Sequence, residues 1–555
     1  MKTLILAAIR CFLLFLIPTV TYAISTQWAM DPISGDWNTV DNWTNGVPNG
    51  PADTATFGLS NTTDISISKD TVVDGISFTP AAGPYTVTAS PGIFLTLSGT
   101  GIMNNSGPIQ NFVTAGEEGD IHSGGRIEFT NNATAGIDTR FTNNASEDIN
   151  AFVGGLTIFG DSSKAGNGTF VNNGATTIAG HGGATIFGGD SHADSGTFVN
   201  DGGMAAGATG GSTRFQGNSH ADSATLSALG GSNGGEGGTI LFQGNSHADS
   251  ATLIADGGTI FFQGNSDGGT TIAGHGGATV KVLGNGLLDL SNHDSGIFSI
   301  GSIEGEGIVD TGDAELSLFI GSNDRNTTFS GVMSALSAID LHKVGTGRLT
   351  LSGKKNQIGG DTDIDGGVLQ VDGTLKSGNT FVFERGTLAG SGTVGSDVVA
   401  DGTVRPGSGE VPGALTISGG YSQGKFATLM IQIAGAGADD YSTLHVRGSA
   451  GLNGILELVL LKGFIPTVDD TFTFLFYHDH FGKFSSIANE NFAPGLKWEL
   501  TDDDYGPSFV TLRVVPASLP IPDQGPTLLL LTFGLLGLMT FRRQLSQDLN
   551  SRRIS

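Results

Sequence analysis

The phrase GGLTIFG at residues 154–160 recurs five more times along the chain with small changes. Every copy has two glycines, a short β-type run and a closing apolar residue. The closing residues follow one another at steps of 28, 28, 27, 20 and 20 positions, and they are Phe159, Phe187, Phe215, Phe242, Phe262 and Val282. A regular period of about 20 to 50 residues is typical of a solenoid, in which each coil packs against its neighbours. Residues 156–284 therefore predict stacked β-coils.

Each 28-residue copy contains three short runs separated by glycine-rich corners. In the first copy these runs are Thr157-Ile158-Phe159, Thr169-Phe170-Val171 and Thr176-Thr177-Ile178. Three short strands per coil predict a parallel β-helix of triangular cross-section. The 20-residue copies have lost one run, so we expect the cross-section to change near Phe242.

The composition indicates an almost all-β chain. With 89 glycines and 17 prolines but no Gly-x-y period, the chain is not collagen-like, and its 33 phenylalanines require a core. A formal charge of −27 disfavours nucleic acid and anionic membranes as partners. The single cysteine, Cys11, lies in the N-terminal leader, so the exported chain would contain no disulfide.

The N-terminus has the pattern of a secretory signal peptide. Residues 1–23 combine Lys2 in a short basic start, the apolar run Cys11–Val20 and small residues before a cleavage site after Ala23. The general secretion machinery is therefore an expected partner, and we expect the body of the protein to be exported.

The C-terminus carries a second apolar run, Thr527–Phe541, followed at once by Arg542 and Arg543. Residues 527–543 are predicted to form a single hydrophobic helix with an arginine pair. Because arginines next to such a helix remain cytoplasmic, residues 544–555 are predicted to be a cytoplasmic tail, with the body across the membrane.

A short motif precedes this helix within the linker 516–526, and it reads Ile-Pro-Asp-Gln-Gly at Ile521–Gly525. Motif, apolar helix and arginine pair together resemble the PEP-CTERM class of sorting tails, in its V-P-D-S-G variant. The resemblance implies that an exosortase-type membrane protease cuts near the motif and passes the protein to the envelope or extracellular matrix. The residues implied in sorting and processing are Pro522, Asp523, Gly525, Arg542 and Arg543. A simple C-terminal inner-membrane anchor is the alternative.

Residues 341–375, LHKVGTGRLTLSGKKNQIGGDTDIDGGVLQVDGTL, resemble the autotransporter-associated β-strand repeat. The residues on that pattern are Lys343, Gly345, Gly347, Leu349, Leu351, Gly353, Gly359, Gly360, Gly367, Leu369 and Val371. The resemblance implies a right-handed parallel β-helix displayed outside the cell. It does not imply autotransport, because the stretch after residue 420 is too short for a translocator barrel.

These patterns divide the body into three parts. An N-terminal cap is predicted at residues 24–70, where Trp28, Trp37 and Trp43 lie among turn-forming residues. The parallel β-helix is predicted at residues 71–420. Residues 421–515 have longer apolar strands and are predicted to form a C-terminal β-rich cap or a small β-sandwich.

The phrase SHADS occurs three times, at Ser191–Ser195, Ser219–Ser223 and Ser246–Ser250. A histidine and an aspartate two positions apart share one face if the segment is extended, and stacked coils would align them in a column. Such a column could bind a divalent cation. The alternative is a solvated turn duplicated with the repeat. The candidate ligands are His192, Asp194, His220, Asp222, His247 and Asp249.

The sequence contains no recognisable catalytic set or phosphate-binding loop. We therefore predict a non-enzymatic, exported bacterial surface or extracellular-matrix protein with a structural or adhesive role, of the kind found in a biofilm matrix. Extracellular polysaccharide is a possible partner. A β-helix polysaccharide-degrading enzyme, a lyase or glycosidase, is the alternative, because such enzymes place carboxylates along a groove.

Overall fold

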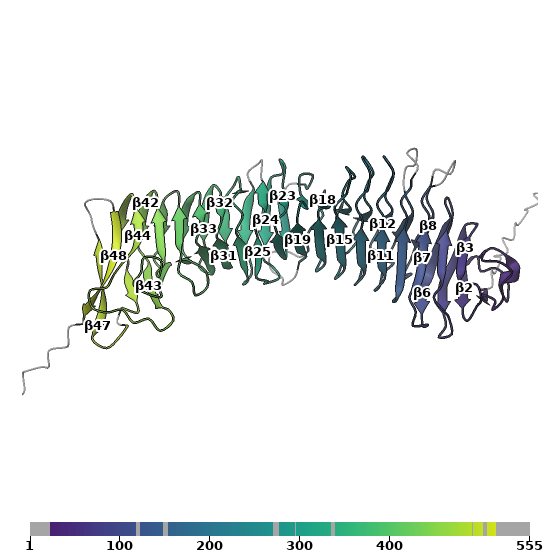
Figure 1. Ribbon diagram of the computed structural model, residues 1–555, viewed down its shortest axis with the longest axis horizontal. Coiled ribbons are helices and arrows are strands. Elements are labelled where there is room, and N and C mark those ends of the chain that lie inside the picture. Colours follow the sequence, from purple (N-terminus) through teal and green to yellow (C-terminus); the bar gives the residue numbers. More distant parts are fainter. Residues whose placement is uncertain are drawn as a thin grey trace, which may run out of the picture.

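The computed structural model describes residues 23–117, 123–147, 154–269, 277–294, 296–334, 339–490, 492–502 and 508–517. In this part the chain forms a long rod of short strands, with the N-terminal coils at one end and the C-terminal coils at the other (Figure 1). One short 3-10 helix, η1 (Val40–Asn42), lies near the start. Nearly all neighbouring strands pair in parallel, so the predicted all-β parallel β-helix is confirmed.

Three sheets run along the rod. The first sheet contains, in the order of their pairing, β1 (Ser25–Gln27), β2 (Gly50–Phe57), β4 (Thr71–Phe78), β6 (Phe94–Asn104), β8 (Arg126–Phe129), β10 (Leu156–Phe159), β12 (Ala184–Phe187), β14 (Ser212–Phe215), β16 (Thr239–Phe242), β18 (Thr259–Phe262), β20 (Leu287–Asp289), β23 (Ile308–Asp310), β26 (Val332–Ser334), β29 (Asn356–Gln357), β32 (Thr374–Lys376), β35 (Thr393–Val394), β38 (Ala414–Ile417), β41 (Thr443–Val446), β44 (Thr471–Tyr477), β48 (Ser508–Pro516) and β47 (Leu496–Asp502).

The second sheet contains β3 (Asp64–Ile67), β5 (Thr86–Ala89), β7 (Gln110–Thr114), β9 (Thr139–Asn143), β11 (Thr169–Asn172), β13 (Thr197–Asn200), β15 (Thr225–Leu229), β17 (Thr252–Asp256), β19 (Thr279–Leu283), β22 (Ser302–Gly305), β25 (Thr327–Phe329), β28 (Arg348–Leu351), β31 (Gly367–Val371), β34 (Gly386–Gly390), β37 (Thr403–Pro406), β40 (Thr428–Ile433), β43 (Ile455–Leu460) and β46 (Ser486–Ala488).

The third sheet begins later along the chain and contains β21 (Gly296–Ile300), β24 (Leu316–Ile320), β27 (Asp340–Lys343), β30 (Thr362–Ile364), β33 (Asn379–Val382), β36 (Asp397–Ala400), β39 (Tyr421–Gln423), β42 (Ser449–Leu452) and β45 (Asp479–Gly482).

The repeated phenylalanines form a stacked column inside the rod, as their spacing predicts. Phe187 and Phe215 pair in register, and their ring centroids are 4.7 Å apart with nearly parallel planes. A second column, which includes Phe170 and Phe198, stacks in the same way on the second sheet. The two columns meet edge to face, with Phe187 and Phe198 centroids 5.5 Å apart. All four rings are fully buried, so the columns form the core of these coils.

The last residue of the predicted ladder, Val282, belongs to a different sheet. It lies on β19 and pairs with Ala255 of the second sheet. In the first sheet β18 is followed by β20, where Phe261 pairs with Asp289. The prediction that Val282 continues the phenylalanine column was therefore wrong. The phrase at residues 276–284 resembles the earlier ones, but its strand belongs to the second sheet.

The prediction of three strands per coil is also wrong for this region. The run Thr176-Thr177-Ile178 lies in a turn, and Ile178 is 67% exposed, so it has no core to pack against. In the 20-residue coil, β17 ends at Asp256 and β18 begins at Thr259, so a turn has been lost and not a strand. The third side of the rod begins at Gly296, with β21, and not near Phe242.

Buried asparagines connect successive coils by a hydrogen-bond ladder. The Nδ2 group of Asn172 donates to Asn200 Oδ1 at 2.7 Å, while Asn172 Oδ1 accepts from Asn143 Nδ2 at 2.7 Å. The hydroxyl of Thr185 donates to the same Oδ1 atom at 3.0 Å. Because a buried amide is costly unless it is paired, these bonds allow asparagine to occupy the core.

The two ends of the rod differ from its middle. Near the N-terminus the rings of Trp28, Trp37 and Trp43 pack around Phe57, with centroid distances of 5.6–6.0 Å to that ring. Near the C-terminus β48 pairs antiparallel with both β44 and β47. Between them the parallel ladders cross residue 420 without a break, since β36 pairs with β39 and β38 with β41. The division into domains at that point stays a prediction.

The predicted hydrophobic helix 527–543, the tail 544–555 and the motif residues Pro522, Asp523 and Gly525 lie outside the described residues. Ala23 is the first residue that the structure describes, and cleavage after it stays a prediction. Within the described ranges, no helix is long and apolar enough to cross a membrane.

Candidate functional site

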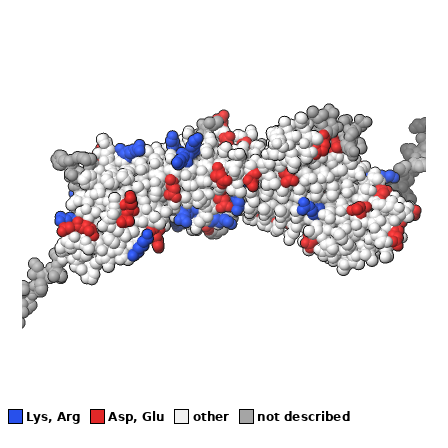
Figure 2. Space-filling model, in the orientation of Figure 1, with Lys and Arg blue, Asp and Glu red and all other residues white. Residues whose placement is uncertain are grey.

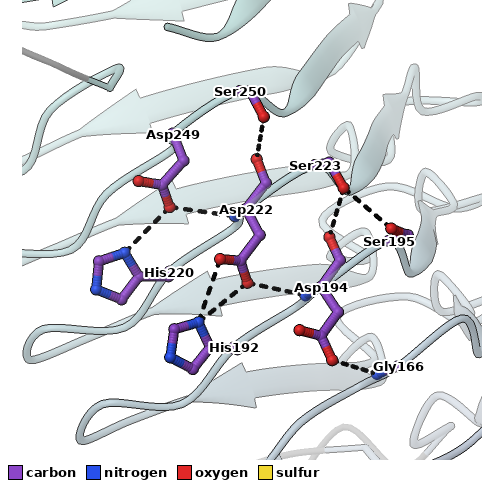
Figure 3. Close-up of polar contacts among 9 residues, drawn as sticks. All are labelled: Gly166, His192, Asp194, Ser195, His220, Asp222, Ser223, Asp249 and Ser250. Carbon is purple, nitrogen blue, oxygen red and sulfur yellow. Dashed lines mark hydrogen bonds and ion pairs between the residues drawn. The ribbon is translucent and has the colours of Figure 1, made fainter. Parts of the chain in front are cut away.

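The SHADS phrases form the corners that connect a strand of the first sheet to a strand of the second sheet in successive coils. Figure 3 shows residues of all three phrases. In each corner the alanine and the first serine point into the core and are fully buried. The aspartates Asp194, Asp222 and Asp249 have φ angles of 48°, 49° and 47°. This left-handed conformation, which aspartate tolerates better than most residues, ends the extended segment at the aspartate.

Each histidine contacts the aspartate of the following coil. His192 Nδ1 lies 3.1 Å from Asp222 Oδ2, and His220 Nδ1 lies 3.1 Å from Asp249 Oδ2. The imidazole rings of His192 and His220 stack with centroids 5.0 Å apart. The structure thus forms the expected column, but its contacts join adjacent coils and not the two residues of one phrase (Figure 3).

The last histidine–aspartate contact of the column uses an aspartate from outside the SHADS phrases. His247 Nδ1 lies 3.1 Å from Asp267 Oδ1 in the 20-residue coil, where the phrase itself is absent. The third histidine therefore keeps an acceptor although the repeat has stopped.

The carboxylates also accept backbone hydrogen bonds between coils. The N–H of Asp194 donates to Asp222 Oδ2 at 3.0 Å, and the N–H of Gly166 donates to Asp194 Oδ2 at 3.3 Å. Burial raises the pKa of Asp194, and the positive charge of Lys164 partly opposes this rise. The column is thus a polar ladder that ties one coil to the next.

A metal site would need more than this ladder provides. A stable zinc or calcium site uses at least three or four protein ligands converging on one point. Across the described ranges, no group of three or more His, Cys, Asp or Glu side chains is placed to hold a metal ion. Divalent cation binding by the SHADS column is untested, and these contacts favour the alternative, a turn duplicated with the repeat.

A second cluster, centred on His342 of β27, was missed at the level of sequence. His342 Nδ1 lies 3.1 Å from Asp365 Oδ2 and 3.4 Å from Asp363 Oδ2, both in the next coil. Its ring stacks on Phe319 of the preceding coil, with centroids 4.2 Å apart and planes at 5°. The hydrogen bond to Asp365 raises the pKa of His342, while burial raises the pKa of Asp363.

Next to His342, the side chain of Lys343 points into the core. Its Nζ group donates to the carbonyl oxygens of Val344 at 2.6 Å and Gly366 at 3.2 Å. Burial lowers the pKa of this amine to about 8. Lys343 therefore holds the turns of two successive coils together, which gives a structural reason for a lysine at this position of the repeat.

A surface depression of about 740 Å³ lies at the corner beside this cluster. It is lined by Phe319, His342, Val344, Gly345, Thr346, Asp365, Gly366, Gly367 and Arg385. An aromatic ring, a carboxylate and a guanidinium thus border one hollow. This combination of apolar surface and a few converging polar groups is typical of a ligand site.

Two known sequence families match short parts of the chain. Residues 341–371 match the passenger-associated-transport repeat, and residues 520–545 match the VPDSG-CTERM motif. The first match contains His342, Lys343, Asp363 and Asp365. The second contains the residues assigned above to sorting, Pro522, Asp523, Gly525, Arg542 and Arg543. The PEP-CTERM-type tail and the autotransporter-associated repeat are therefore confirmed.

Two larger proteins share segments with the chain. An adhesin autotransporter, BmaC, of Brucella suis biovar 1 (strain 1330) is 35% identical over 125 residues, which cover 20% of this chain and 4% of that protein. An extracellular serine protease of Serratia marcescens is 46% identical over 70 residues, 12% of this chain and 6% of that protein. The chain thus spans a small fraction of either relative. Repeats and sorting motif together indicate an exported protein of the cell envelope or extracellular space.

Proposed function

We propose that this chain is a non-enzymatic structural and adhesive protein of the bacterial surface or extracellular matrix, placed there through its C-terminal signal. One observation carries the proposal. A continuous β-helix with a passenger-type repeat is joined in one chain to a VPDSG-CTERM motif.

The rod is suited to a mechanical role. Each coil forms parallel ladders with the coils before and after it, and the stacked phenylalanines, asparagines and SHADS corners add side-chain ladders in the same direction. Bending the rod would separate several of these ladders at once, so we expect it to be stiff. On the face shown in Figure 2, charged residues are dispersed among uncharged ones, and the net charge is −27.

Delivery to the surface would use both ends of the chain. The general secretion machinery would export the body after recognition of residues 1–23, and the helix 527–543 would hold it in the inner membrane for a time. An exosortase-type protease would then cut near Pro522-Asp523. The match at residues 520–545 supports this route. A permanent inner-membrane anchor is the competing outcome.

A polysaccharide-degrading enzyme is the second candidate, and one observation favours it. Asp363 and Asp365 lie on one face beside His342, and burial raises the pKa of Asp363. Glycosidases use a pair of carboxyl groups of which one is protonated. Loss of viscosity from neutral or acidic polysaccharides incubated with the purified protein would support the enzyme and contradict the adhesive proposal.

The adhesive proposal is tested in the cells that make the protein. Wild-type cells should expose the rod to external protease and attach to surfaces, whereas the double variant Arg542→Ala/Arg543→Ala should retain an unprocessed protein and attach less. The matched control is Arg552→Ala/Arg553→Ala, which removes two arginines from the tail without touching the pair. Unchanged attachment when the surface protein is absent would contradict an adhesive role.

A further inference from the structure

The outward face of the third sheet has an unusual row of side chains. The strand registers place Phe319, His342, Asp363, Phe381 and Val399 at equivalent outward positions of five successive coils. Parallel strands lie about 4.8 Å apart, so the row runs along the rod axis with one side chain per coil.

A second outward row runs beside the first. The backbone N–H groups of Asp365, Phe383 and Asp401 each donate to the strand of the preceding coil, which places the three residues at the same position of successive coils. The rings of Phe381 and Phe383 lie side by side, with centroids 6.5 Å apart and planes at 26°. Aromatic surface and carboxylates therefore alternate on this face.

Two apolar residues of these rows are open to solvent: Phe383 is 43% exposed and Val399 is 37% exposed. Phe381 is half-buried, and Phe319, under the ring of His342, is buried. Single exposed apolar side chains are common on proteins, but adjacent ones in a row along a sheet indicate a binding surface. The hollow of about 740 Å³ adjoins the rows, because His342 and Asp365 belong to both.

The negative charge on this face favours uncharged, hydroxyl-bearing polymers over anionic ones. Asp340 begins β27 and Asp397 begins β36, Asn379 is in register with Asp397 on β33, and Asp361 directly precedes β30. These aspartates add to Asp363, Asp365 and Asp401. Carboxylates repel anionic polymers, and they accept hydrogen bonds from hydroxyl groups. Exposed aromatic rings pack against the apolar faces of sugar rings by burial of both surfaces.

We propose that the outward face of β27, β30, β33 and β36, with the adjoining hollow, binds a neutral polysaccharide chain lying along the rod axis. The inference rests on the proposed adhesive function and names its ligand class. The aromatic residues Phe381 and Phe383 provide the main apolar contact, and the aspartates of the flanking rows accept hydrogen bonds from sugar hydroxyls.

Affinity electrophoresis of the protein purified from its own cells tests this proposal. The gels contain hydroxyethyl cellulose, a soluble β-glucan or galactomannan as neutral polymers, and alginate as an acidic one. At least one neutral polymer should slow the wild-type protein, and alginate should not. Phe381→Ala/Phe383→Ala should weaken the apparent affinity about tenfold, equivalent to about 1.4 kcal/mol.

The control is Phe426→Ala, which removes an exposed ring from a turn outside the third sheet and should bind as the wild type does. If the double variant does not fold, judged by circular dichroism and its melting midpoint, Phe383→Ser alone provides the test because Phe383 is 43% exposed. Equal retardation of wild type and variant, retardation by alginate, or no retardation by any neutral polymer would each overturn the proposal.

The result of the binding experiment can be distinguished from the result of the test of the adhesive function. A protein that reaches the surface and promotes attachment, but binds no neutral polymer, contradicts only the ligand class. A protein that never reaches the surface contradicts the proposed function, whatever it binds in a gel.

Discussion

The Nδ1 atom of His192 lies 3.1 Å from the carboxylate of Asp222, a residue of the next coil. The same carboxylate accepts the backbone N–H of Asp194 at 3.0 Å. One aspartate thus fixes both a side chain and the backbone of the preceding coil. The second and third SHADS copies thus each supply the acceptor for the copy before them.

Replacement of this aspartate should loosen the column. Asp222→Ala removes two acceptor contacts that are partly exposed, so we expect a loss of about 1–2 kcal/mol and a lower melting midpoint. Asp222→Asn keeps an acceptor and tolerates the left-handed conformation, so its effect should be smaller. The control is Glu410→Ala, at an exposed turn. An Asp222→Ala midpoint equal to that of the control would show that the contacts do not stabilise the rod.

Added divalent cations should leave the melting midpoint unchanged. The carboxylates of the SHADS column are engaged by His Nδ1 and backbone N–H groups, so an ion would have to displace these partners. Thermal unfolding with excess calcium, with zinc and with chelator checks this. A rise in the wild-type midpoint that Asp222→Asn abolishes would instead establish a cation site there.

The phenylalanine column should dominate local stability. Phe215 is fully buried and stacks on Phe187 and on Phe242, with 4.7 Å between ring centroids on both sides. Phe215→Ala should cost about 3–5 kcal/mol, whereas Phe426→Ala, at a 75% exposed ring, should change stability by less than about 0.5 kcal/mol. Faster hydrogen exchange confined to the coils around β14 is the expected signature. Uniform exchange across the whole rod would contradict a core made of local stacks.

The buried amine of Lys343 makes stability depend on alkaline pH. Its pKa is about 8 in the folded chain and near 10.5 when unfolded, so between these values the unfolded state holds a proton that the folded state has released. Stability relative to Lys343→Met should therefore be flat below pH 8 and rise by about 3 kcal/mol up to pH 10.5. Denaturant unfolding of both proteins across this range measures it. A constant difference would mean that the amine is not buried.

Much of the fold could be predicted because the repeats preserve their spacing. A phenylalanine every 27 or 28 residues, or 20 in one coil, must stack if the coils are in register, and Phe159 to Phe262 do so. Val282 was misplaced because a glycine-preceded β-run looks the same on either sheet. Ile178 was assigned to a strand because the run consists of β-branched residues between glycine-rich corners, although its side chain is exposed.

The candidate site was harder to predict because its coils differ in length. From Phe319 to His342, Asp363 and Phe381 the steps are 23, 21 and 18 residues, so no ladder is visible in the sequence. The SHADS column was visible because its copies are identical, but its pairing was not. The spacing within a phrase indicates which residues share a face, whereas the contact depends on the register between coils.

Export of the rod and its release by processing at the C-terminal motif can be tested by intact-mass spectrometry of the protein recovered from the cell surface and medium. We expect a chain that begins after Ala23, ends near Pro522-Asp523 and lacks Thr527–Phe541. A surface protein that still carries Thr527–Phe541 would contradict sorting by cleavage and establish the membrane anchor.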